Sequence, residues 1–367
     1  MEEAEQFQNK VLSTIHVSER ETNPVIDSEI TKELETYVSR FFFSLPFLGA
    51  SQGTVREINS SGGDGDAGDF DTPTTIVKST DRIVDDNLDT KSKERSLCSP
   101  IRVKLNCSDD QSGDCKIKRR KDKEQKEVLT IEHKMATSLQ GVGFQVWSGA
   151  LLLCDYLLLH QTEVCGSHVL DLGSGPGLTA IIAALFADTV ICTDYSSEIV
   201  HLAQRNWERN CDLLPALGSQ NMIFKVLDWN NDSPFDPDPS CSTDHYNIKE
   251  DDAVLLQNIN LILAAEVVYD DDITDAFFKT IYYLLVEPPS KHVLVSLERR
   301  VLYSTRSHEV CSPAYEHFRE NLDDLTSVDE GPVRFLAQQL STDFPACFDY
   351  DRFKELELWK ISSVFPS

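Results

Sequence analysis

Residues 167–177 have the sequence SHVLDLGSGPG, in which a short apolar run is followed by glycines at alternate positions. The apolar run 167–172 predicts a buried strand, and the residues that follow, 178–186, predict a helix. Glycine between a strand and a helix permits positive φ and lets a ligand approach the backbone closely. The stretch therefore predicts a βα unit with a ligand-binding turn, although a turn needed only for packing is the alternative.

The same alternation of strand and helix continues along the chain. Predicted strands are 189–193, 221–227, 261–265 and 292–297, and predicted helices are 143–160, 197–210 and 277–285. A helix near 314–320, a segment at 333–340 and a strand near 356–361 are expected to add an antiparallel edge. Apolar strands alternating with helices are typical of a parallel sheet covered on both faces. The fold class is therefore α/β, with a doubly wound, mostly parallel sheet.

Composition excludes several classes of protein. The chain has 367 residues, of which 41% are hydrophobic and 26% charged, as in globular proteins. Its net charge of -27 disfavours direct binding to nucleic acid. Polar residues interrupt the long apolar stretch 255–268, so we expect no membrane segment, and the first residues lack the pattern of a signal peptide. The ten cysteines lack zinc spacing, so neither a disulfide nor a metal site is expected.

Residues 1–127 are expected to be a partly disordered N-terminal extension, and residues 128–367 the folded domain. Serine, glycine, aspartate and lysine dominate 51–126, as in a linker. Within it, the run 116–123 holds six cations in eight residues, which suits either a nuclear import receptor or a solvated charge run. The segment 41–48 (FFFSLPFL) either docks on a core or serves as a partner motif. We expect the protein in the nucleus, with the cytoplasm as a further location.

The spacing of acids and glycines indicates which cofactor the turn holds. Asp194 ends the next predicted strand, 23 residues after Asp171, where a carboxylate binds the two hydroxyls of a ribose. The glycines follow G-x-G-x-G rather than the dinucleotide pattern, and Asp171 would repel a pyrophosphate but suits an amino group. Both features favour S-adenosylmethionine over NAD.

Asp228 and Trp229 close the third strand. Their carboxylate and indole suit the amino group and ring of adenine, the alternative being a turn aspartate and a core tryptophan.

Five segments together resemble one known family. They are 143–150 (GFQVWSGA), 171–177 (DLGSGPG), 193–196 (TDYS), 228–229 (DW) and 264–269 (AAEVVY). Over about residues 131–367 the chain resembles the class I, seven-stranded methyltransferases, and within them the methyltransferase-like protein-lysine methyltransferases. The resemblance implies a Rossmann-like fold and S-adenosylmethionine as cofactor. It assigns the cofactor to Trp147, Gly173, Gly175, Gly177, Asp194 and Asp228, and the predicted cofactor site also includes Asp171, Tyr195 and Trp229.

The catalytic pair implied by the resemblance is Glu266 and Tyr269. The family usually has Asp-x-x-Tyr after the fourth strand, whereas this chain has Glu266-Val-Val-Tyr269, with a carboxylate one methylene longer. Methyl transfer needs a neutral amine, and deprotonating a free lysine at pH 7 costs about 4.6 kcal/mol. A carboxylate favours the ammonium form, so Glu266 is expected to place the cofactor or dock the lysine, and Tyr269 to orient the amine. The alternative is a strand-end acid and a core tyrosine.

The substrate is indicated by charge. Residues 232–275 hold twelve acids and one base, which either attract a lysine-rich protein or form a solvated surface. The sequence therefore predicts a monomeric protein N-lysine methyltransferase that acts on a non-histone, lysine-rich nuclear protein. The alternatives are a non-catalytic module that binds the cofactor and a methyltransferase with a non-lysine acceptor. A nicotinamide oxidoreductase is disfavoured by the glycine spacing.

Overall fold

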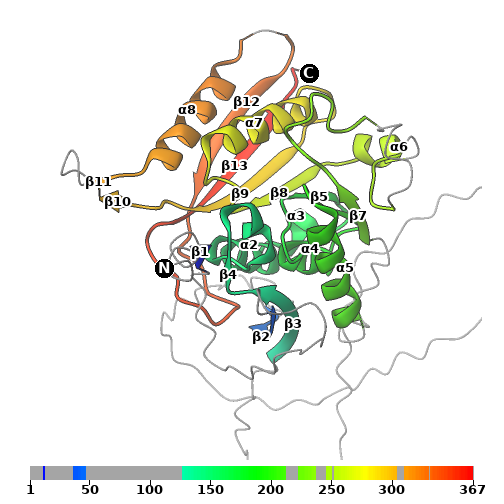
Figure 1. Ribbon diagram of the computed structural model, residues 1–367. Coiled ribbons are helices and arrows are strands. Elements are labelled where there is room, and N and C mark those ends of the chain that lie inside the picture. The colour runs from blue at the N-terminus through cyan, green and yellow to red at the C-terminus, as the bar shows by residue number, and fades with distance from the viewer. Residues whose placement is uncertain are drawn as a thin grey trace, which may run out of the picture. The chain divides into compact units, whose positions relative to one another are not determined.

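A seven-stranded sheet organises the protein, in the order β12-β13-β9-β8-β5-β6-β7 (Figure 1). The strands are β5 (His168–Leu172), β6 (Thr189–Asp194), β7 (Met222–Val226), β8 (Leu261–Ala265), β9 (His292–Glu298), β12 (Arg334–Leu340) and β13 (Leu356–Val364). Five strands are parallel, while β13 pairs antiparallel with both β9 and β12. The chain winds outward from β5 in one direction and then in the other, so the predicted doubly wound, mostly parallel sheet with an antiparallel edge is confirmed.

The computed structural model describes residues 11–12, 36–46, 126–211, 222–236, 245–249, 252–303, 310–329 and 331–366. They all belong to one unit of the chain, made of residues 1–46 and 122–367. The basic run 116–123, residues 47–48 and most of the predicted linker lie outside the described residues.

Both faces of the sheet are buried, because the central strands are apolar at successive positions. In β5, Val169 belongs to the hydrophobic core on one face and Leu170 to the core on the other. Helices α2 (Ser148–Leu159), α4 (Leu178–Ala183) and α5 (Ser197–Cys211) supply the first core. Helices α6 (Asp252–Gln257), α7 (Asp271–Leu285) and α8 (Pro313–Ser327) pack against the second. The remaining short helix is α3 (Gln161–Val164).

The segment Leu139–Leu159 is long and apolar enough, by length and composition alone, to cross a membrane. A core helix passes the same test, and 67% of the apolar 18-residue stretch within this segment is buried inside the protein. Most of it is α2, which packs against α4 and the strands β9 and β13. The helix predicted at 143–160 begins only at Ser148, because Leu139–Phe144 form the 3-10 helix η1.

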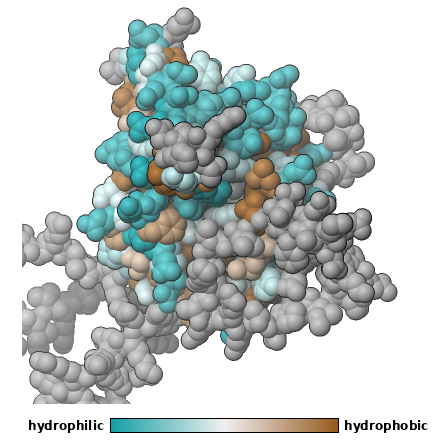
Figure 2. Space-filling model, turned by 60° about the vertical axis from the view of Figure 1, so that its left-hand side comes forward, coloured by the Kyte–Doolittle hydropathy of each residue, from teal (hydrophilic) through white to brown (hydrophobic). Residues whose placement is uncertain are grey.

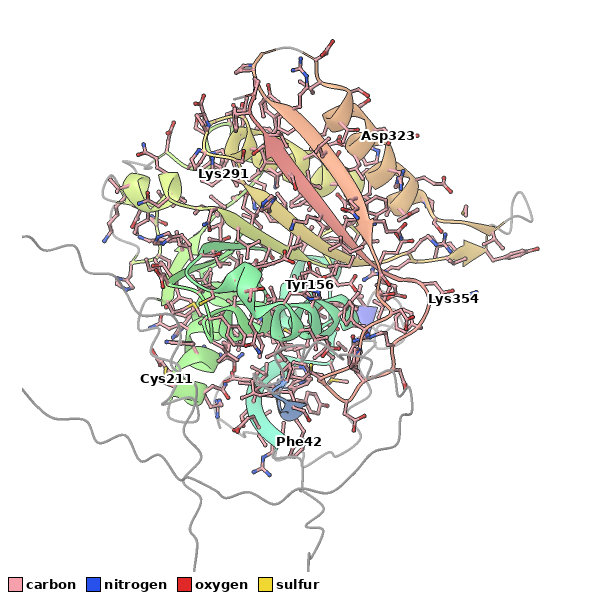
Figure 3. The ribbon with its side chains drawn as sticks, turned by 180° about the vertical axis from the view of Figure 1, so that it is seen from behind. Phe42, Tyr156, Cys211, Lys291, Asp323 and Lys354 are labelled. Carbon is pink, nitrogen blue, oxygen red and sulfur yellow. The ribbon has the colours of Figure 1, made fainter. Side chains whose placement is uncertain are left out.

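The N-terminal part of the chain contributes to the folded unit. Strand β2 (Thr36–Ser44) pairs antiparallel with β3 (Lys126–Lys134), and β1 (Val11–Leu12) pairs with β4 (Ala136–Thr137) (Figure 3). Phe41 and Phe43 are buried in the first core, and the ring of Phe43 stacks on Phe348 with 5.1 Å between centroids. Of the two alternatives for residues 41–48, docking on the core is the one that the structure shows for its described part.

Two helices are longer than predicted by more than a turn. Helix α7 begins at Asp271 rather than at residue 277, because Asp270 caps it by accepting a hydrogen bond from Ile273 N at 3.1 Å. Helix α8 begins at Pro313, a residue favoured in a first helical turn, and continues to Ser327. Sequence analysis missed α6 and the small hairpin of β10 (Leu302–Tyr303) and β11 (Val310–Cys311). Elements this short give too little periodicity to detect.

Because β2 packs on the core, substituting two neighbouring phenylalanines by alanine should lower the free energy of unfolding by very different amounts. Phe43→Ala should lower the free energy of unfolding by ~3–5 kcal/mol, because it empties a fully buried site. The matched control Phe42→Ala, on the more exposed face of β2, should cost ~1 kcal/mol or less. Urea denaturation of both full-length variants measures this. Equal losses would contradict the packing of β2 on the core.

Candidate functional site

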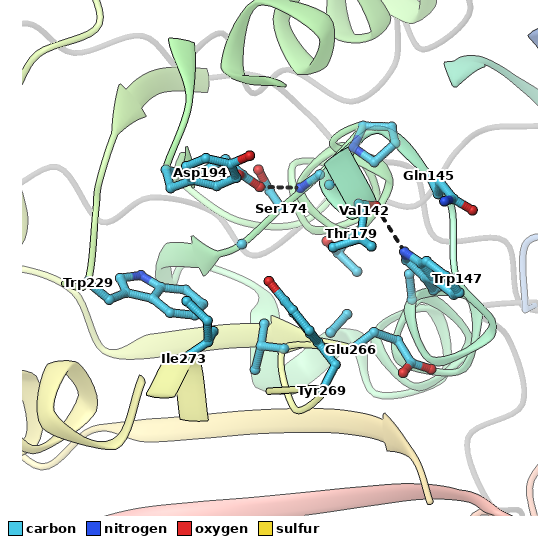
Figure 4. Close-up of a pocket in the computed structure, with 18 of the residues that line it drawn as sticks. Val142, Gln145, Trp147, Ser174, Thr179, Asp194, Trp229, Glu266, Tyr269 and Ile273 are labelled. Atoms are coloured by element: carbon cyan, nitrogen blue, oxygen red, sulfur yellow. Dashed lines mark hydrogen bonds between the residues drawn. The ribbon is translucent and has the colours of Figure 1, made fainter. Parts of the chain in front are cut away.

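A cavity of about 470 Å³ opens at the carboxyl ends of the parallel strands (Figure 4). Its walls come from the ends of β5, β6, β7 and β8, from η1 and from the start of α2. Its volume is in the range of small-molecule sites, and its place is where doubly wound sheets bind ligands. Nine of the eleven site residues predicted from the sequence line it: Trp147, Gly173, Gly175, Asp194, Tyr195, Asp228, Trp229, Glu266 and Tyr269.

The glycine turn brings bare backbone to the cavity wall. Gly173 and Gly175 have φ angles of 67° and 54°, in the left-handed region that favours glycine. A Cβ added to Gly175 would lie 3.0 Å from the carbonyl oxygen of Gly143. A side chain at this position would therefore strain the backbone and crowd the wall.

Asp171 and Gly177 do not line the cavity. Asp171 is fully buried behind Thr179, whose hydroxyl donates to Asp171 Oδ2 at 2.5 Å and which itself lines the cavity. Burial, with the nearby charge of Asp194, raises the pKa of Asp171 to about 7. Gly177 precedes α4, and a Cβ there would lie 3.0 Å from the Cβ of Ala203 on α5. The structure thus gives Gly177 the packing role that sequence analysis left as the alternative for the turn.

Asp194 connects the glycine turn to the end of β6. Its Oδ2 accepts a hydrogen bond from Gly175 N at 3.0 Å, and its Oδ1 accepts one from Tyr195 N at 2.9 Å. Burial raises the pKa of Asp194 to about 6, although these two N–H groups oppose the shift. The hydroxyl of Tyr195 donates to the carbonyl oxygen of Gln140, which ties η1 to this side of the cavity.

Asp228 and Trp229 form the opposite wall, after β7. Asp228 Oδ1 accepts hydrogen bonds from the backbone and side-chain nitrogens of Asn230, at 3.0 and 3.1 Å. The Trp229 ring lies 5.6 Å from that of Phe277, while its buried Nε1 has no hydrogen-bond partner among the described residues. Sequence analysis missed Asn230, whose contact depends on the local turn. The wall combines a hydrophobic ring, an unpaired donor and a carboxylate.

Glu266 lies at the junction of three elements. It follows β8 with a φ of 58°, and its side chain turns toward the start of α2. Its Oε1 accepts a hydrogen bond from Gly149 N at 2.9 Å, and its Oε2 accepts one from Glu298 N at 3.3 Å. A Cβ on Gly149 would lie 2.6 Å from Oε1, so a side chain at this position would displace the Glu266 carboxylate. Both carboxylate oxygens are therefore held by backbone, which makes Glu266 a positioning group.

Arg300 and Trp147 extend this junction. Burial raises the pKa of Glu266 to about 7, and the charge of Arg300 opposes the shift. The Arg300 guanidinium lies over the Trp147 ring, 5.1 Å from its centroid, and Trp147 Nε1 donates to the carbonyl oxygen of Val142 at 3.2 Å. Sequence analysis quoted Gly149 only as part of the segment 143–150 and missed Arg300, because no motif joins either residue to Glu266.

Tyr269 extends into the cavity between these walls (Figure 4). Burial is the main reason why its pKa is raised to about 12, and the negative charge of Asp194 adds to the shift. The phenol therefore stays protonated at neutral pH, and its oxygen is a neutral donor and acceptor.

The cavity is negative. Among the described residues that line it, four are carboxylic acids (Asp194, Asp228, Glu266 and Asp270) and none is lysine, arginine or histidine. Such a lining suits a cationic ligand and opposes a pyrophosphate.

Residues 123–312, more than half of the chain, match a family model described as "Lysine methyltransferase". The chain belongs to this family. The mouse protein "Methyltransferase-like protein 22" is 40% identical to this chain over 236 residues, which are 64% of this chain and 59% of the mouse protein. The human protein of that name is 40% identical over 237 residues, 64% and 57% of the two chains. Mouse "Protein N-lysine methyltransferase METTL21A" is 28% identical over 180 residues, which are 49% of this chain and 70% of the mouse protein.

The matched region thus spans less than two thirds of the length of the first two relatives. Membership confirms the family predicted from the sequence and its methyl donor, S-adenosylmethionine. The cavity fits this cofactor on its own chemistry. Its carboxylates suit the sulfonium and amino groups, and the bare glycine turn admits close approach. Trp229 offers an aromatic ring to a purine.

The raised pKa of Glu266 predicts a specific dependence of stability on pH. Between about 4.5 and 7 the folded protein binds the Glu266 proton more tightly than the unfolded chain does, so stability falls as pH rises through this window. The free energy of unfolding of wild type should therefore fall by roughly 3 kcal/mol relative to that of Glu266→Gln across the window. Denaturation of both proteins at several pH values measures the difference.

Glu163→Gln is the control of opposite sign. Burial alone would raise the pKa of Glu163, but the hydrogen bond and charge of Lys360 outweigh it and lower the pKa. Its stabilising contribution is present at neutral pH and is lost as pH falls. A wild-type profile that parallels that of Glu266→Gln would contradict a Glu266 that is protonated in this window.

Proposed function

We propose that this protein is an S-adenosylmethionine-dependent protein N-lysine methyltransferase, which acts on a non-histone, lysine-rich protein of the nucleus. The observation that carries the proposal is the cavity at the strand ends, with four carboxylates, no cationic side chain among its described lining residues and a neutral phenol inside it. The bound cofactor would supply an activated methyl group. Trp147, Asp194, Asp228 and Trp229 would hold it.

The acceptor must arrive as a neutral amine in line with the methyl group. Tyr269 stays protonated, and its oxygen can still accept a hydrogen bond from an N–H of the lysine amine, which leaves the nitrogen lone pair free to face the methyl group. Glu266 acts on the site indirectly. Its oxygens accept hydrogen bonds from Gly149 N and Glu298 N, and they thereby hold the cavity wall beside Tyr269. The apolar side chains Val267 and Ile273 help to keep water from the cavity. The amine proton leaves to solvent.

Charge supports a basic protein as substrate. Asp228 and Asp270 line the cavity, Asp271 and Asp272 follow in the first turn of α7, and the chain as a whole carries a charge of -27. Such a field accelerates encounter with a lysine-rich partner and opposes nucleic acid. We further propose a monomer that does not bind membranes. It would enter the nucleus through an import receptor that binds residues 116–123, with the cytoplasm as a further location.

Two substitutions separate cofactor binding from transfer. Asp228→Ala should weaken binding of S-adenosylmethionine roughly tenfold, because it removes a charged acceptor from the wall. Tyr269→Phe should leave that affinity unchanged and lower methyl transfer by roughly tenfold to a hundredfold, because the amine loses its orienting group. Calorimetry gives the affinities. Transfer of labelled methyl into extract from cells that lack the protein, followed by mass spectrometry, gives the rates and the acceptor.

Label on a lysine with wild type, and much less with Tyr269→Phe, supports the proposal. Label on another residue type would show that the acceptor is not lysine and would contradict the proposed substrate. Cofactor binding without transfer to any protein would favour a non-catalytic module, and Asp228→Ala binding as tightly as wild type would contradict the assignment of the wall.

A further inference from the structure

The β10–β11 hairpin exposes an unusual set of side chains for so small an element. Val301, Leu302, Tyr303 and Val310 are 48%, 56%, 61% and 68% exposed, and they are four of the eleven exposed large hydrophobic side chains in the described part of the chain. Leu302 and Tyr303 are consecutive in β10, so they point to opposite faces of the strand, and both are exposed. The hairpin therefore presents apolar side chains on both of its faces.

The hairpin projects from the rest of the sheet (Figure 1). Figure 2, turned so that this side faces the viewer, shows hydrophobic patches within a largely hydrophilic surface. A two-stranded hairpin is marginally stable alone, and a cluster of exposed apolar side chains marks an interaction site in a soluble protein.

The base of the hairpin is built from the wall of the cavity. Just before it, Glu298 N donates to Glu266 Oε2, and the Arg300 guanidinium lies over Trp147. Arg299 N donates to the carbonyl oxygen of Glu355 at 2.8 Å, so the neighbouring residue is fixed as well. Glu266 and Trp147 both line the cavity. A molecule that binds the hairpin is thus held next to the place where the methyl group is transferred.

We infer that the β10–β11 hairpin, through Val301, Leu302, Tyr303 and Val310, docks apolar side chains of the substrate protein that flank its target lysine. The inference rests on the proposed function. Charge selects this occupant over a second copy of the chain or an anionic membrane, because both would be repelled by a protein of charge -27. Leu139 and Tyr195, 52% and 50% exposed, line the cavity itself, so apolar surface is also present at its rim.

The test uses a peptide library with one central lysine and randomised neighbours, together with full-length protein. Wild type should methylate peptides that carry apolar residues beside the lysine at least tenfold faster, in kcat/KM, than peptides with serine and glycine there. The double variant Leu302→Ser/Val310→Ser should lose roughly this tenfold preference and keep its rate on the serine and glycine peptides. Its affinity for S-adenosylmethionine should match that of wild type, because neither side chain lines the cavity.

Leu336→Ser is the matched control, since Leu336 is 58% exposed on β12 at the far edge of the sheet. It should behave as wild type. An unchanged preference in the double variant would overturn the inference while leaving the proposed function intact. Transfer by wild type to no lysine in the library or in the extract would overturn both. A sedimentation shift from dimer to monomer in the double variant would show a second copy as the occupant and overturn the inference.

Discussion

The hydrogen bonds from Gly149 and Glu298 to the carboxylate of Glu266 hold the site together. They join the ends of β8 and β9 to the start of α2, three elements that are far apart in the chain. Glu266 N donates to the carbonyl oxygen of Ser296, and Ser296 Oγ donates to that of Gly149, so the same three elements are bonded a second time. The backbone at Glu266 has a φ of 58°, which costs roughly 1–3 kcal/mol at a residue other than glycine.

Hydrogen bonds and a nearby charge act on the Glu266 carboxylate against the burial that raises its pKa. The carboxylate lies at the N-terminus of α2, where the helix dipole and free N–H groups stabilise a negative charge. Arg300 adds a positive charge nearby and packs on Trp147, so the tryptophan that walls the cavity is fixed by the same group of residues. A glutamate reaches Gly149 N and Glu298 N together, and the extra methylene relative to aspartate supplies the reach. The resemblance in sequence led us to expect an aspartate here, and the glutamate makes both of these contacts.

The sequence predicted the central strands well because apolar runs mark them, and β5 and β8 are almost fully buried. The bounds of β8 match those predicted, and most site residues lie at strand ends, where a motif places them by itself. The residue roles that the sequence did not predict depend on contacts between parts of the chain that only the folded structure brings together. The motif does not show that Asp171 lies behind Thr179. Nor does it show that Gly177 packs so close to Ala203 that a Cβ would crowd it. Gly149 and Arg300 contact the site across the fold, and only the packed structure brings them there.

An N-terminal segment outside the region that matches the family also contacts a residue of the cavity. Gln145 lines the cavity and is 1% exposed, and its Nε2 donates to the carbonyl oxygen of Val11 at 3.0 Å and to Thr137 Oγ1 at 2.7 Å. Val11 lies outside the matched residues 123–312, yet it fixes a side chain on the cofactor wall. Pairing of β1 with β4 sets the position of that carbonyl. The carbonyl oxygen of Val11 is therefore one of two acceptors, with Thr137 Oγ1, that hold the buried amide nitrogen of a residue lining the cavity.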